Sequence, residues 1–460
     1  MTTHIAVIGS GPAGVMAAQA AADAGATVTL IGAEPPGGRA GWHSLLPSKV
    51  MLTAADSLGL AQRFQKLGLS EADQTPDSAA MVQRIRSLSQ AWSERLTADV
   101  TQEGVQFLRG QAAFQSERRL IITPPEGDPI ELEADAFIVA SGSVPIFPPQ
   151  LKPNGKQIIA PRFVGKLDHL PKSIIVVGGG VTGTEFTYAF NRLGVEVTWL
   201  VDQFGVLPPF ERDVVDVLME ELTGRNVVCH QGVAAESAVA DDSGVTVTLQ
   251  NGQIFNADMA FIAIGRRPDV AGLNLAAAGL PEDLRQGISV DGYGRSTVAH
   301  IYAAGDASGM PMTANKAMAQ GWIAGRHVAG ASVAPYRSET VVEAVYTEPQ
   351  VAQVGLSKIE AREAGHAVQV RHLDYGANLK AMLMDDTVGF VKLVADADDG
   401  TVLGASAVGD HATDTLAAIA LGIGLKAKLS DIASLFAAHP GLSELAFAAA
   451  RASKSLESSL

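Results

Sequence analysis

The chain has 460 residues and a formal net charge of -15 at pH 7, with a sequence pI near 5.1. An acidic chain lacks the basic surface that nucleic-acid binding requires, so we expect no nucleic-acid partner. Its 47% hydrophobic and 18% charged residues are typical of a folded chain. Its length exceeds what one hydrophobic core organises, so we expect several domains.

The N-terminal residues 1–4 lead directly into the apolar run 5–8, without the basic and long apolar regions of a signal peptide. No apolar run approaches the ~20 residues needed to span a bilayer. The longest, residues 416–425, predicts a buried helix. We therefore expect a cytoplasmic protein with no membrane span. The single cysteine, Cys229, excludes a disulfide within the chain, and we interpret it as a packed, unreactive thiol.

Residues 4–31 predict a strand, a glycine turn, a helix and a second strand. The turn reads Gly9-Ser10-Gly11-Pro12-Ala13-Gly14, a GxGxxG pattern that follows a strand and opens a helix. Such glycines let the backbone turn tightly and approach a pyrophosphate at the helix N-terminus. An acidic residue usually binds the ribose at the end of the second strand, where this chain has Gly32. The first carboxylate is Glu34, to which we assign that role.

Residues 37–49 read Gly-Gly-Arg-Ala-Gly-Trp-His-Ser-Leu-Leu-Pro-Ser-Lys, a glycine pair followed by a bulky segment and Pro-Ser-Lys. Helical patterning then covers residues 49–67 and 79–98. Trp92 and Leu96 lie on an apolar stripe of the second helix, which we interpret as core. Residues 105–114 predict one strand, and residues 136–145 predict a buried strand that ends in a turn of small residues. The proline-rich stretch that follows, up to residue 153, is typical of a linker.

A second strand, glycine turn and helix begin at residue 173, and the turn reads Gly178-Gly179-Gly180-Val181-Thr182-Gly183. The next strand ends in Val201-Asp202-Gln203, so Asp202 is the candidate ligand of a ribose. No basic residue stands there to meet a 2′-phosphate, which favours NAD(H) over NADP(H). Two such units in one chain are far more specific than either alone.

Further motifs follow in order along the chain. A turn containing Gly265 ends the second unit, and the strand-like run 301–304 leads into Gly305-Asp306. The segment 311–317 predicts the start of a helix, and from about residue 336 alternating strands follow. Near the C-terminus stands His439-Pro440-Gly441-Leu442-Ser443-Glu444.

These motifs, in this order, resemble those of the pyridine nucleotide-disulfide oxidoreductases, a family that includes dihydrolipoamide dehydrogenase, glutathione reductase and mercuric reductase. The resemblance covers nearly the whole chain and weakens around residues 68–78 and in the last ten. It implies the α/β architecture of glutathione reductase, with two Rossmann-like domains and a C-terminal α+β dimerisation domain. Residues 1–150 and 270–335 would then bind FAD, residues 151–269 would bind NAD(P), and residues 336–460 would form a homodimer.

The family pattern runs Gly-Gly-Thr-Cys, four residues, Cys, an apolar residue and Pro-Ser-Lys, and the two cysteines form a redox-active disulfide beside the flavin. Laid on this chain, the cysteines fall on Ala40 and Leu45, neither of which can exchange with a disulfide. The resemblance therefore implies an FAD-dependent NAD(P)H oxidoreductase that lacks dihydrolipoamide dehydrogenase and glutathione reductase activity. Its acceptor would be a quinone or another diaphorase acceptor, a second pyridine nucleotide or a redox partner protein. The alternative is a non-catalytic FAD-bound dimer that acts as a scaffold or redox sensor.

The resemblance also gives roles to four catalytic candidates. In the family, the residues at Lys49 and Glu185 form an ion pair beside flavin N5 that favours reduced flavin and orients the nicotinamide. The alternative is an ordinary Lys at a helix start and a Glu on a helix face. The residues at His439 and Glu444 shuttle protons to the dithiol across the dimer interface, since an imidazole titrates near neutrality. Without thiols, His439 either protonates a different acceptor or is retained for packing.

The resemblance places the remaining candidates in two nucleotide sites. The FAD site comprises Gly9, Gly11, Gly14, Glu34, Gly38, Lys49, Ala112, Ser141, Gly142, Gly305, Asp306, Met312 and Ala314. The NAD(P) site comprises Gly178, Gly180, Gly183, Asp202 and Gly265. Asp306 would accept a hydrogen bond from a ribityl hydroxyl of the flavin. The segment Trp42-His43-Ser44 either shapes an acceptor pocket or fills volume left by altered packing. We expect no metal site.

Overall fold

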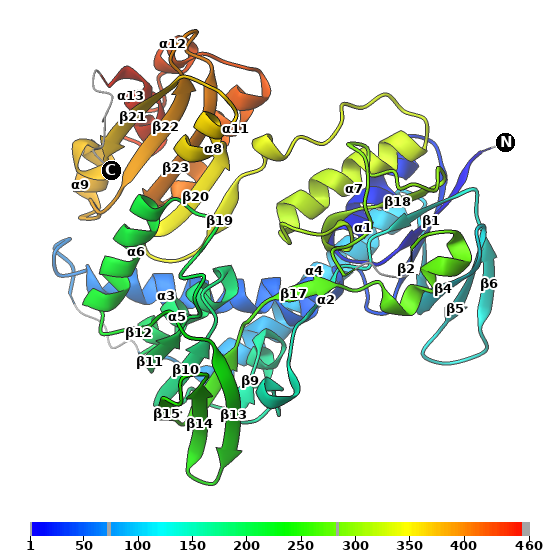
Figure 1. Cartoon of the computed structure of the whole chain (residues 1–460), viewed down its shortest axis with the longest axis horizontal. Coiled ribbons are helices and arrows are strands. Elements are labelled where there is room, and N and C mark those ends of the chain that lie inside the picture. The colour runs from blue at the N-terminus through cyan, green and yellow to red at the C-terminus, as the bar shows by residue number, and fades with distance from the viewer. Residues whose placement is uncertain (1, 71–74, 282–284, 453–460) are drawn as a thin grey trace.

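The computed structural model describes residues 2–70, 75–281 and 285–452 (Figure 1). Its helices are α1 Pro12–Asp23, α2 Gly38–His43, α3 Leu45–Gln62, α4 Ser78–Gln102, α5 Val181–Arg192, α6 Arg212–Gly224, α7 Ala314–Val328, α8 Lys358–Glu363, α9 Leu379–Leu383, α10 Ala412–Thr415, α11 Ala417–Gly424, α12 Leu429–Ala433 and α13 Glu444–Arg451.

The strands follow the same chain order. They are β1 His4–Ile8, β2 Thr27–Gly32, β3 Gln106–Arg109, β4 Gln111–Ser116, β5 Arg119–Thr123, β6 Ile130–Glu133, β7 Ala136–Val139, β8 Ser143–Pro145, β9 Ile158–Ile159, β10 Ser173–Val177, β11 Glu196–Leu200, β12 Val228–His230, β13 Ala235–Asp241, β14 Gly244–Leu249, β15 Ile254–Ala257, β16 Met259–Ile262, β17 Arg266–Pro268, β18 Ile301–Ala303, β19 Glu343–Val345, β20 Gln350–Gly355, β21 Val368–Asp374, β22 Phe390–Asp396 and β23 Val402–Gly409.

The N-terminal unit is a parallel sheet of order β18-β7-β1-β2-β3. Its central strand β1 has Ile5, Ala6 and Val7 fully buried, as a parallel strand covered on both faces requires. Helix α7, more than 280 residues further along the chain, packs closely on α1. A Cβ at Gly321 or Gly325 would overlap backbone oxygens of α1, so only glycine allows this approach. Helix α7, which follows the Gly305-Asp306 motif, is thereby fixed beside α1, the helix that follows the first glycine turn.

The expected strand over residues 105–114 is wrong in one respect, because Gly110 divides it. Strand β3 pairs with β2 in the parallel sheet, while β4 pairs with β5 in the separate antiparallel sheet β4-β5-β6. A Cβ at Gly110 would lie 2.7 Å from Ile122 Cγ2 and 2.9 Å from Thr123 O. A glycine is therefore needed where the chain leaves one sheet for the other.

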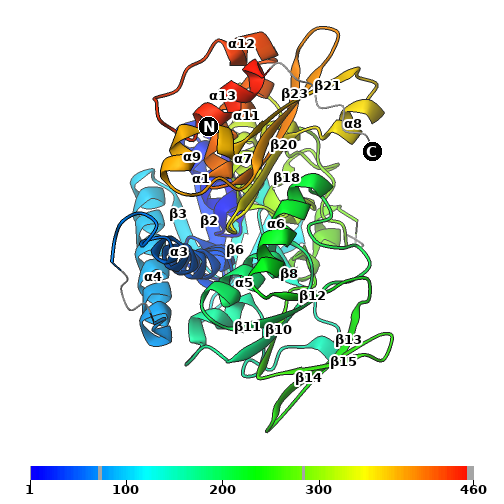
Figure 2. The same cartoon turned by 90° about the vertical axis from the view of Figure 1, so that its left-hand side faces the viewer.

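The second unit repeats this arrangement as a parallel sheet of order β12-β11-β10-β16-β9, with the antiparallel sheet β13-β14-β15 beside it. Trp199 on β11 is fully buried, and its indole nitrogen donates to Gly178 O at 2.9 Å. This hydrogen bond from a buried side chain fixes the carbonyl of Gly178, the first glycine of the second glycine turn. Sheet β13-β14-β15 and the C-terminal sheet β19-β20-β23-β22-β21 lie at opposite ends of the molecule (Figures 1 and 2).

The C-terminal unit is an antiparallel sheet of order β19-β20-β23-β22-β21 with α9–α13 around it. The run 416–425 is mainly helical, but it is not the buried helix that its composition predicts. Leu416 and Ile419 are fully buried, whereas Leu421 and Leu425 are 64% and 73% exposed. No helix in the described residues is long and apolar enough to cross a membrane.

Helix α4 also differs from expectation. Trp92 is half exposed rather than part of the core, and Leu96 is partly buried. The buried face of α4 includes Ser89 and Ser93, whose hydroxyls donate to the carbonyls of Gly41 and Pro36 at 2.9 and 2.7 Å. This face therefore supports the backbone around α2, which lies where the family disulfide would be.

Candidate flavin and nicotinamide site

The three glycines of the first turn have different structural functions. A Cβ at Gly9 would overlap Ala140 O, and a Cβ at Gly14 would overlap Gly9 O, so both are required for backbone packing. A Cβ at Gly11, the N-cap of α1, would meet no described atom within 4 Å. This open position at a helix N-terminus fits the pyrophosphate of a dinucleotide. Gly38 lies against it, since a Cβ there would be 2.8 Å from Gly11 N.

The second turn has the same division. A Cβ at Gly178 would overlap Ala263 O, and a Cβ at Gly183 would overlap Gly178 O. A Cβ at Gly180, the N-cap of α5, would again meet no described atom within 4 Å. The two turns therefore leave equivalent openings at the N-termini of α1 and α5.

Two buried hydroxyls, one next to the first turn and one at the start of α7, lack a hydrogen-bond partner among the described residues. They are Ser141 Oγ, two residues after β7, and Thr313 Oγ1 at the N-cap of α7. Buried polar atoms are normally hydrogen-bonded. Together with the opening at Gly11, these atoms fit FAD as the bound group. Met312 and Ala314 flank Thr313 at the same helix start.

Asp306 lies in the 3-10 turn Gly305–Ser308 and accepts a hydrogen bond from Ser143 Oγ. Arg266 in turn donates to Ser143 Oγ and O at 2.8 and 2.9 Å. Burial lowers the pKa of Arg266, and the nearby Asp306 carboxylate opposes that shift. Asp306 is thus held in place by β8 and β17 and is available as an acceptor near Gly305.

Glu34 does not lie free at the end of β2. Its carboxylate is 3.3 Å from His43 Nε2, and its backbone oxygen accepts from Ser10 Oγ at 2.6 Å. A side chain at Gly32 would overlap Ser10 Oγ, which explains why an acidic residue cannot stand there. Ser10 therefore fixes the backbone of Glu34, and the Glu34 carboxylate contacts His43 in the segment that replaces the disulfide.

Lys49 and Glu185 are brought together from α3 and α5, 136 residues apart. Lys49 Nζ donates to both carboxylate oxygens of Glu185, at 2.7 and 2.8 Å. Glu185 is 4% exposed, so its charge needs this partner. The backbone amide of Tyr346 donates to Glu185 Oε1 at 3.0 Å, and its ring lies 4.3 Å from Lys49 Nζ. Tyr346 is a site residue that the sequence did not predict, and its place before Thr-Glu-Pro is the one signal that could have found it.

The positions of the family cysteines show no compensating redox group. Ala40 lies in α2, and Leu45 opens α3 and is 39% exposed. Arg39, at the family's Thr position, pairs with Asp269 at 2.6 Å and donates to Ser141 O at 2.5 Å. The basic residue was visible in the sequence, but its partners were not.

Asp202 follows β11, and its Oδ1 accepts from the amide of Phe204 at 3.1 Å. Val201 is fully buried under the second turn, since a Cβ at Gly179 would lie 2.6 Å from Val201 Cγ1. The side chain at position 201 therefore points away from solvent, and Asp202 is the acidic side chain at this strand end. Gly265 has φ of +120° and accepts from the amide of Ile146 at 2.9 Å.

The remaining predicted site residues lie at three separate places. Ala112 on β4 is 8% exposed and pairs with Ile122, while Gly142 has φ of +77°. His439 Nδ1 contacts Glu444 Oε1 at 3.0 Å, and its side chain is 65% exposed. The Gly441 amide and His439 hold the pKa of Glu444 below its usual range. Among the described residues of one chain, His439 contacts Glu444 and forms no hydrogen bond with Lys49 or Glu185.

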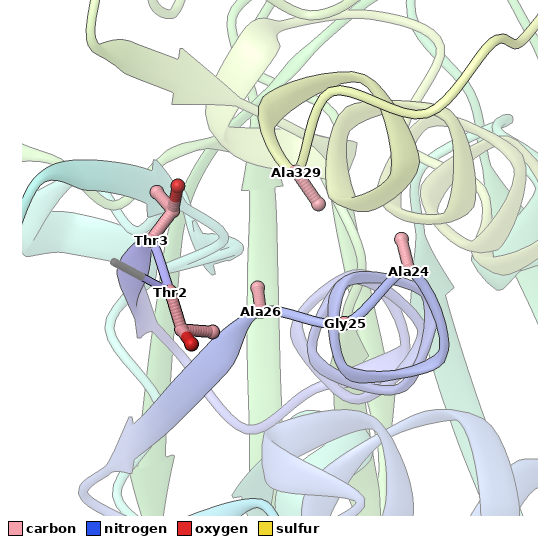
Figure 3. A pocket seen from close by; sticks show the side chains of 6 residues that line it. All are labelled: Thr2, Thr3, Ala24, Gly25, Ala26 and Ala329. Carbon is pink, nitrogen blue, oxygen red and sulfur yellow. The ribbon is translucent and has the colours of Figure 1, made fainter.

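Neither Lys49 nor Glu185 lines either of two surface pockets, although Trp42 of the candidate acceptor segment lines the second. The first, of about 420 Å³, lies at the C-terminal end of α1 and is lined by Thr2, Thr3, Ala24, Gly25, Ala26 and Ala329 (Figure 3). Its lining has no titratable side chain. The second, of about 650 Å³, is lined by Pro35, Trp42 and residues of α4. The described residues contain no cluster of three or more His, Cys, Asp or Glu that could hold a metal.

Comparison with known proteins identifies the family. The pyridine nucleotide-disulphide oxidoreductase family matches residues 3–321, and the dimerisation domain of that family matches residues 341–450. The chain therefore belongs to the pyridine nucleotide-disulphide oxidoreductases. These are FAD-dependent enzymes that use pyridine nucleotides, and the glutathione reductase-like fold class expected from the sequence is confirmed.

Named relatives differ in activity. The chain is 32% identical over 458 residues to dihydrolipoyl dehydrogenase 2 of Haloarcula marismortui, covering 98% of this chain and 97% of the relative. It is 32% identical over 462 residues to an NAD(P)H dehydrogenase (quinone) of Mycobacterium tuberculosis, covering 98% and 94%. The crystal structure of LpdA from Mycobacterium tuberculosis matches with a TM-score of 0.93 at 32% identity, covering 98% and 99%. The flavoprotein disulfide reductase RclA of Escherichia coli, at 24% identity and TM-score 0.86, shows the shared fold.

Proposed function

We propose that this protein reduces bound FAD with NAD(P)H and passes the electrons to an acceptor that is not a disulfide. The observation that carries the proposal is a complete Lys49–Glu185 pair beside a segment with Ala40 and Leu45 in place of thiols. The remaining thiol, Cys229, lies on β12, and burial raises its pKa to about 11. A thiol that is protonated at neutral pH is a poor nucleophile.

The chain's own residues would prepare the flavin for hydride transfer. FAD, when bound, supplies the group that takes a hydride from nicotinamide and later releases its electrons. The openings at Gly11 and Gly180 would hold the two pyrophosphates at helix N-termini. Lys49 would place a positive charge where negative charge develops on reduction, and such preorganised charge lowers the barrier. Glu185 and Tyr346 hold the ammonium of Lys49 in one orientation.

The proposed acceptors are quinones and other diaphorase acceptors, a second pyridine nucleotide or a redox partner protein. The relative named NAD(P)H dehydrogenase (quinone) supports a quinone most directly. The relatives named dihydrolipoyl dehydrogenase would suggest lipoamide, but the thiols of the family motif are absent here. The carboxylate of Asp202 and the absence of a basic residue beside it in the sequence support NADH as the donor.

The match to the family's dimerisation domain supports a homodimer. We propose the predicted boundaries for its parts, with residues 336–460 forming the interface. In the dimer, His439, positioned by Glu444, would face the flavin site of the other copy and protonate the acceptor.

The test is anaerobic mixing of purified holoprotein with NADH, and separately NADPH, followed by flavin absorbance in a stopped-flow instrument. Rapid bleaching by one nucleotide, then reoxidation by a benzoquinone and not by lipoamide, is the expected result. Dihydrolipoamide-dependent NAD reduction as fast as quinone reduction would overturn the non-disulfide acceptor. If dithionite reduces the flavin but neither nucleotide does, the protein is instead a scaffold or redox sensor.

A further inference from the structure

Helices α3 and α5 contact each other through polar side chains at successive positions along the two helices. The Lys49–Glu185 pair is the first contact. About two helical turns along α3, Asp56 Oδ1 accepts from Tyr188 Oη at 2.6 Å. At the helix ends, Arg192 Nη1 donates to Gln62 Oε1 at 2.5 Å. The spacing keeps one face of each helix turned to the other, so these contacts form a continuous polar seam from Lys49 to Arg192.

The segment between β19 and β20 touches both ends of this seam. Tyr346 contacts the Lys49–Glu185 pair through its backbone amide and its ring. Two residues later, Glu348 pairs with Arg192 and lies 3.5 Å from Tyr188 Oη. One short stretch of the C-terminal unit therefore holds the seam at its start and at its end.

Glu348 is the point on which three arginines converge. Arg63 and Arg225 are the C-cap residues of α3 and α6, and Arg192 is the last residue of α5. Arg225 Nη1 donates to Glu348 O at 2.5 Å, while its Nη2 and Arg63 Nη2 each lie 4.0 Å from the carboxylate. The carboxylate is thus the shared partner of cations at the ends of three helices, where cations are favoured.

The approach of Glu348 to α3 requires a glycine. A Cβ at Gly59 would overlap Glu348 Oε2 and lie 3.3 Å from Arg192 Cζ. Glycine is otherwise unfavourable in the middle of a helix, by about 1 kcal/mol relative to alanine. The position of Glu348 is therefore built into the backbone of α3 as well as into the charges around it.

We infer that Glu348 is a positioning residue for hydride transfer. By fixing residues 346–348 to α3 and α5, it holds the Tyr346 amide on Glu185 and the Tyr346 ring at Lys49. The orientation of the Lys49 ammonium toward the flavin then depends on a carboxylate that touches neither cofactor. This inference rests on the proposed function, because it concerns the same reductive step.

The test compares flavin reduction in holoprotein variants at a series of NADH concentrations. Glu348→Gln keeps the shape of the side chain and removes its charge. We expect its limiting rate constant of flavin reduction to fall about 10-fold, because misplacement of a reacting group by even 1 Å is costly. The NADH concentration at half-maximal rate and the FAD content should not change, since Glu348 touches neither ligand.

Gly59→Ala provides a second variant that keeps every charge. Alanine is the better helix former, so loss of helix stability cannot explain a defect. Its Cβ displaces the Glu348 carboxylate, so we expect the same fall in limiting rate constant. Wild-type limiting rate constants in both variants would overturn the inference.

The matched control is Lys392→Met. Lys392 on β22 is 7% exposed and pairs with Glu211 and Asp213 at 3.0 and 2.6 Å, which also joins the C-terminal sheet to α6. We expect this variant to lower Tm without changing flavin reduction; an equal loss of rate would make Glu348 merely structural and overturn the inference. A wild-type flavin that neither NADH nor NADPH reduces would instead refute the proposed function, and the inference with it.

Discussion

The two ends of residues 37–49 differ in how well they match the family motif, although they lie close together in the sequence. At one end, Lys49 keeps a complete set of contacts to Glu185 and Tyr346. At the other, Ala40 and Leu45 occupy the cysteine positions and carry no redox group. In the proposed function, the Lys49 end belongs to the side of the flavin site that serves the nicotinamide. Toward Ala40 the chain has lost the side that serves a disulfide.

Under the proposed function, the two half-reactions therefore depend on separate residues. The proposed nicotinamide side consists of helices α3 and α5 and the segment before β20, whose charged groups neutralise one another. At the positions of the family cysteines, Ala40 lies within α2 and Leu45 is the first residue of α3. Loss of Lys49 would leave the buried Glu185 carboxylate without its cationic partner.

The strongest test of the retained side is Lys49→Met. It removes the positive charge and, among the described residues, leaves the buried Glu185 carboxylate with the Tyr346 amide as its hydrogen-bond donor. We expect the rate constant of flavin reduction by NADH to fall roughly 10²- to 10³-fold, as for loss of a preorganised charge. Stopped-flow absorbance measures it.

The control for that variant is Lys66→Met, which removes a lysine just beyond α3 that pairs on the surface with Asp385. Its side chain is 69% exposed, so we expect a wild-type rate constant. A Lys49→Met protein that is reduced as fast as the control would contradict the role proposed for Lys49 in hydride transfer.

Gly11→Val and Gly14→Val separate cofactor binding from folding. A side chain at Gly11 enters the open position at the start of α1, so we expect FAD affinity to fall about 100-fold while the apoprotein keeps its Tm. A side chain at Gly14 overlaps Gly9 O, so that variant should not fold. Flavin fluorescence titration and thermal unfolding measure the two effects. Normal FAD affinity in Gly11→Val would contradict the assignment of the first turn.

His439→Gln tests the acceptor side. Its imidazole is largely exposed in one chain and is oriented by Glu444. We expect quinone turnover to fall about 10-fold, a modest loss for removal of a proton donor, with no change in flavin reduction by NADH. Steady-state and stopped-flow rates distinguish the two steps. Unchanged quinone turnover would mean that the histidine serves packing.

The smallest effect is expected at Cys229. Cys229→Ser should leave flavin reduction and turnover unchanged. Because burial raises the pKa of Cys229 to about 11 from 9.0, its thiolate fraction at pH 8 is about 100-fold lower than that of an unperturbed thiol. Alkylation by iodoacetamide should therefore be slow at pH 8 and rise as the pH approaches 11.

A Leu45→Cys variant sharpens this contrast, because it returns a thiol to a position that is 39% exposed. We expect that thiol to be alkylated much faster than Cys229 at pH 8. Equal reactivity of the two thiols would contradict the interpretation of Cys229 as buried and inert.

Local sequence patterns were sufficient for the parts of the site that depend on short spacings. A glycine turn between a strand and a helix has a geometry that its own residues impose, so both turns were identified at the residue level. The family motif placed Lys49 and Glu185 at opposing helices, and the structure brings them together at 2.7 Å. The absence of the two family thiols could be read from the sequence alone, because Ala40 and Leu45 contain no sulfur.

Contacts between segments that are distant in sequence could be found only in the tertiary structure. The break at Gly110 depends on the proximity of Ile122, and the placement of Glu34 depends on Ser10 and His43. The exposure of Trp92, expected to be core, was set by which face of α4 supports α2.

Glu348 shows the reason most clearly. In the sequence it is one acidic residue before a proline, with nothing to mark it. Its role arises because the ends of α3, α5 and α6 converge on it while Gly59 leaves room for its carboxylate. Periodicity records which side of an element is apolar, but it does not record which other element will approach that side.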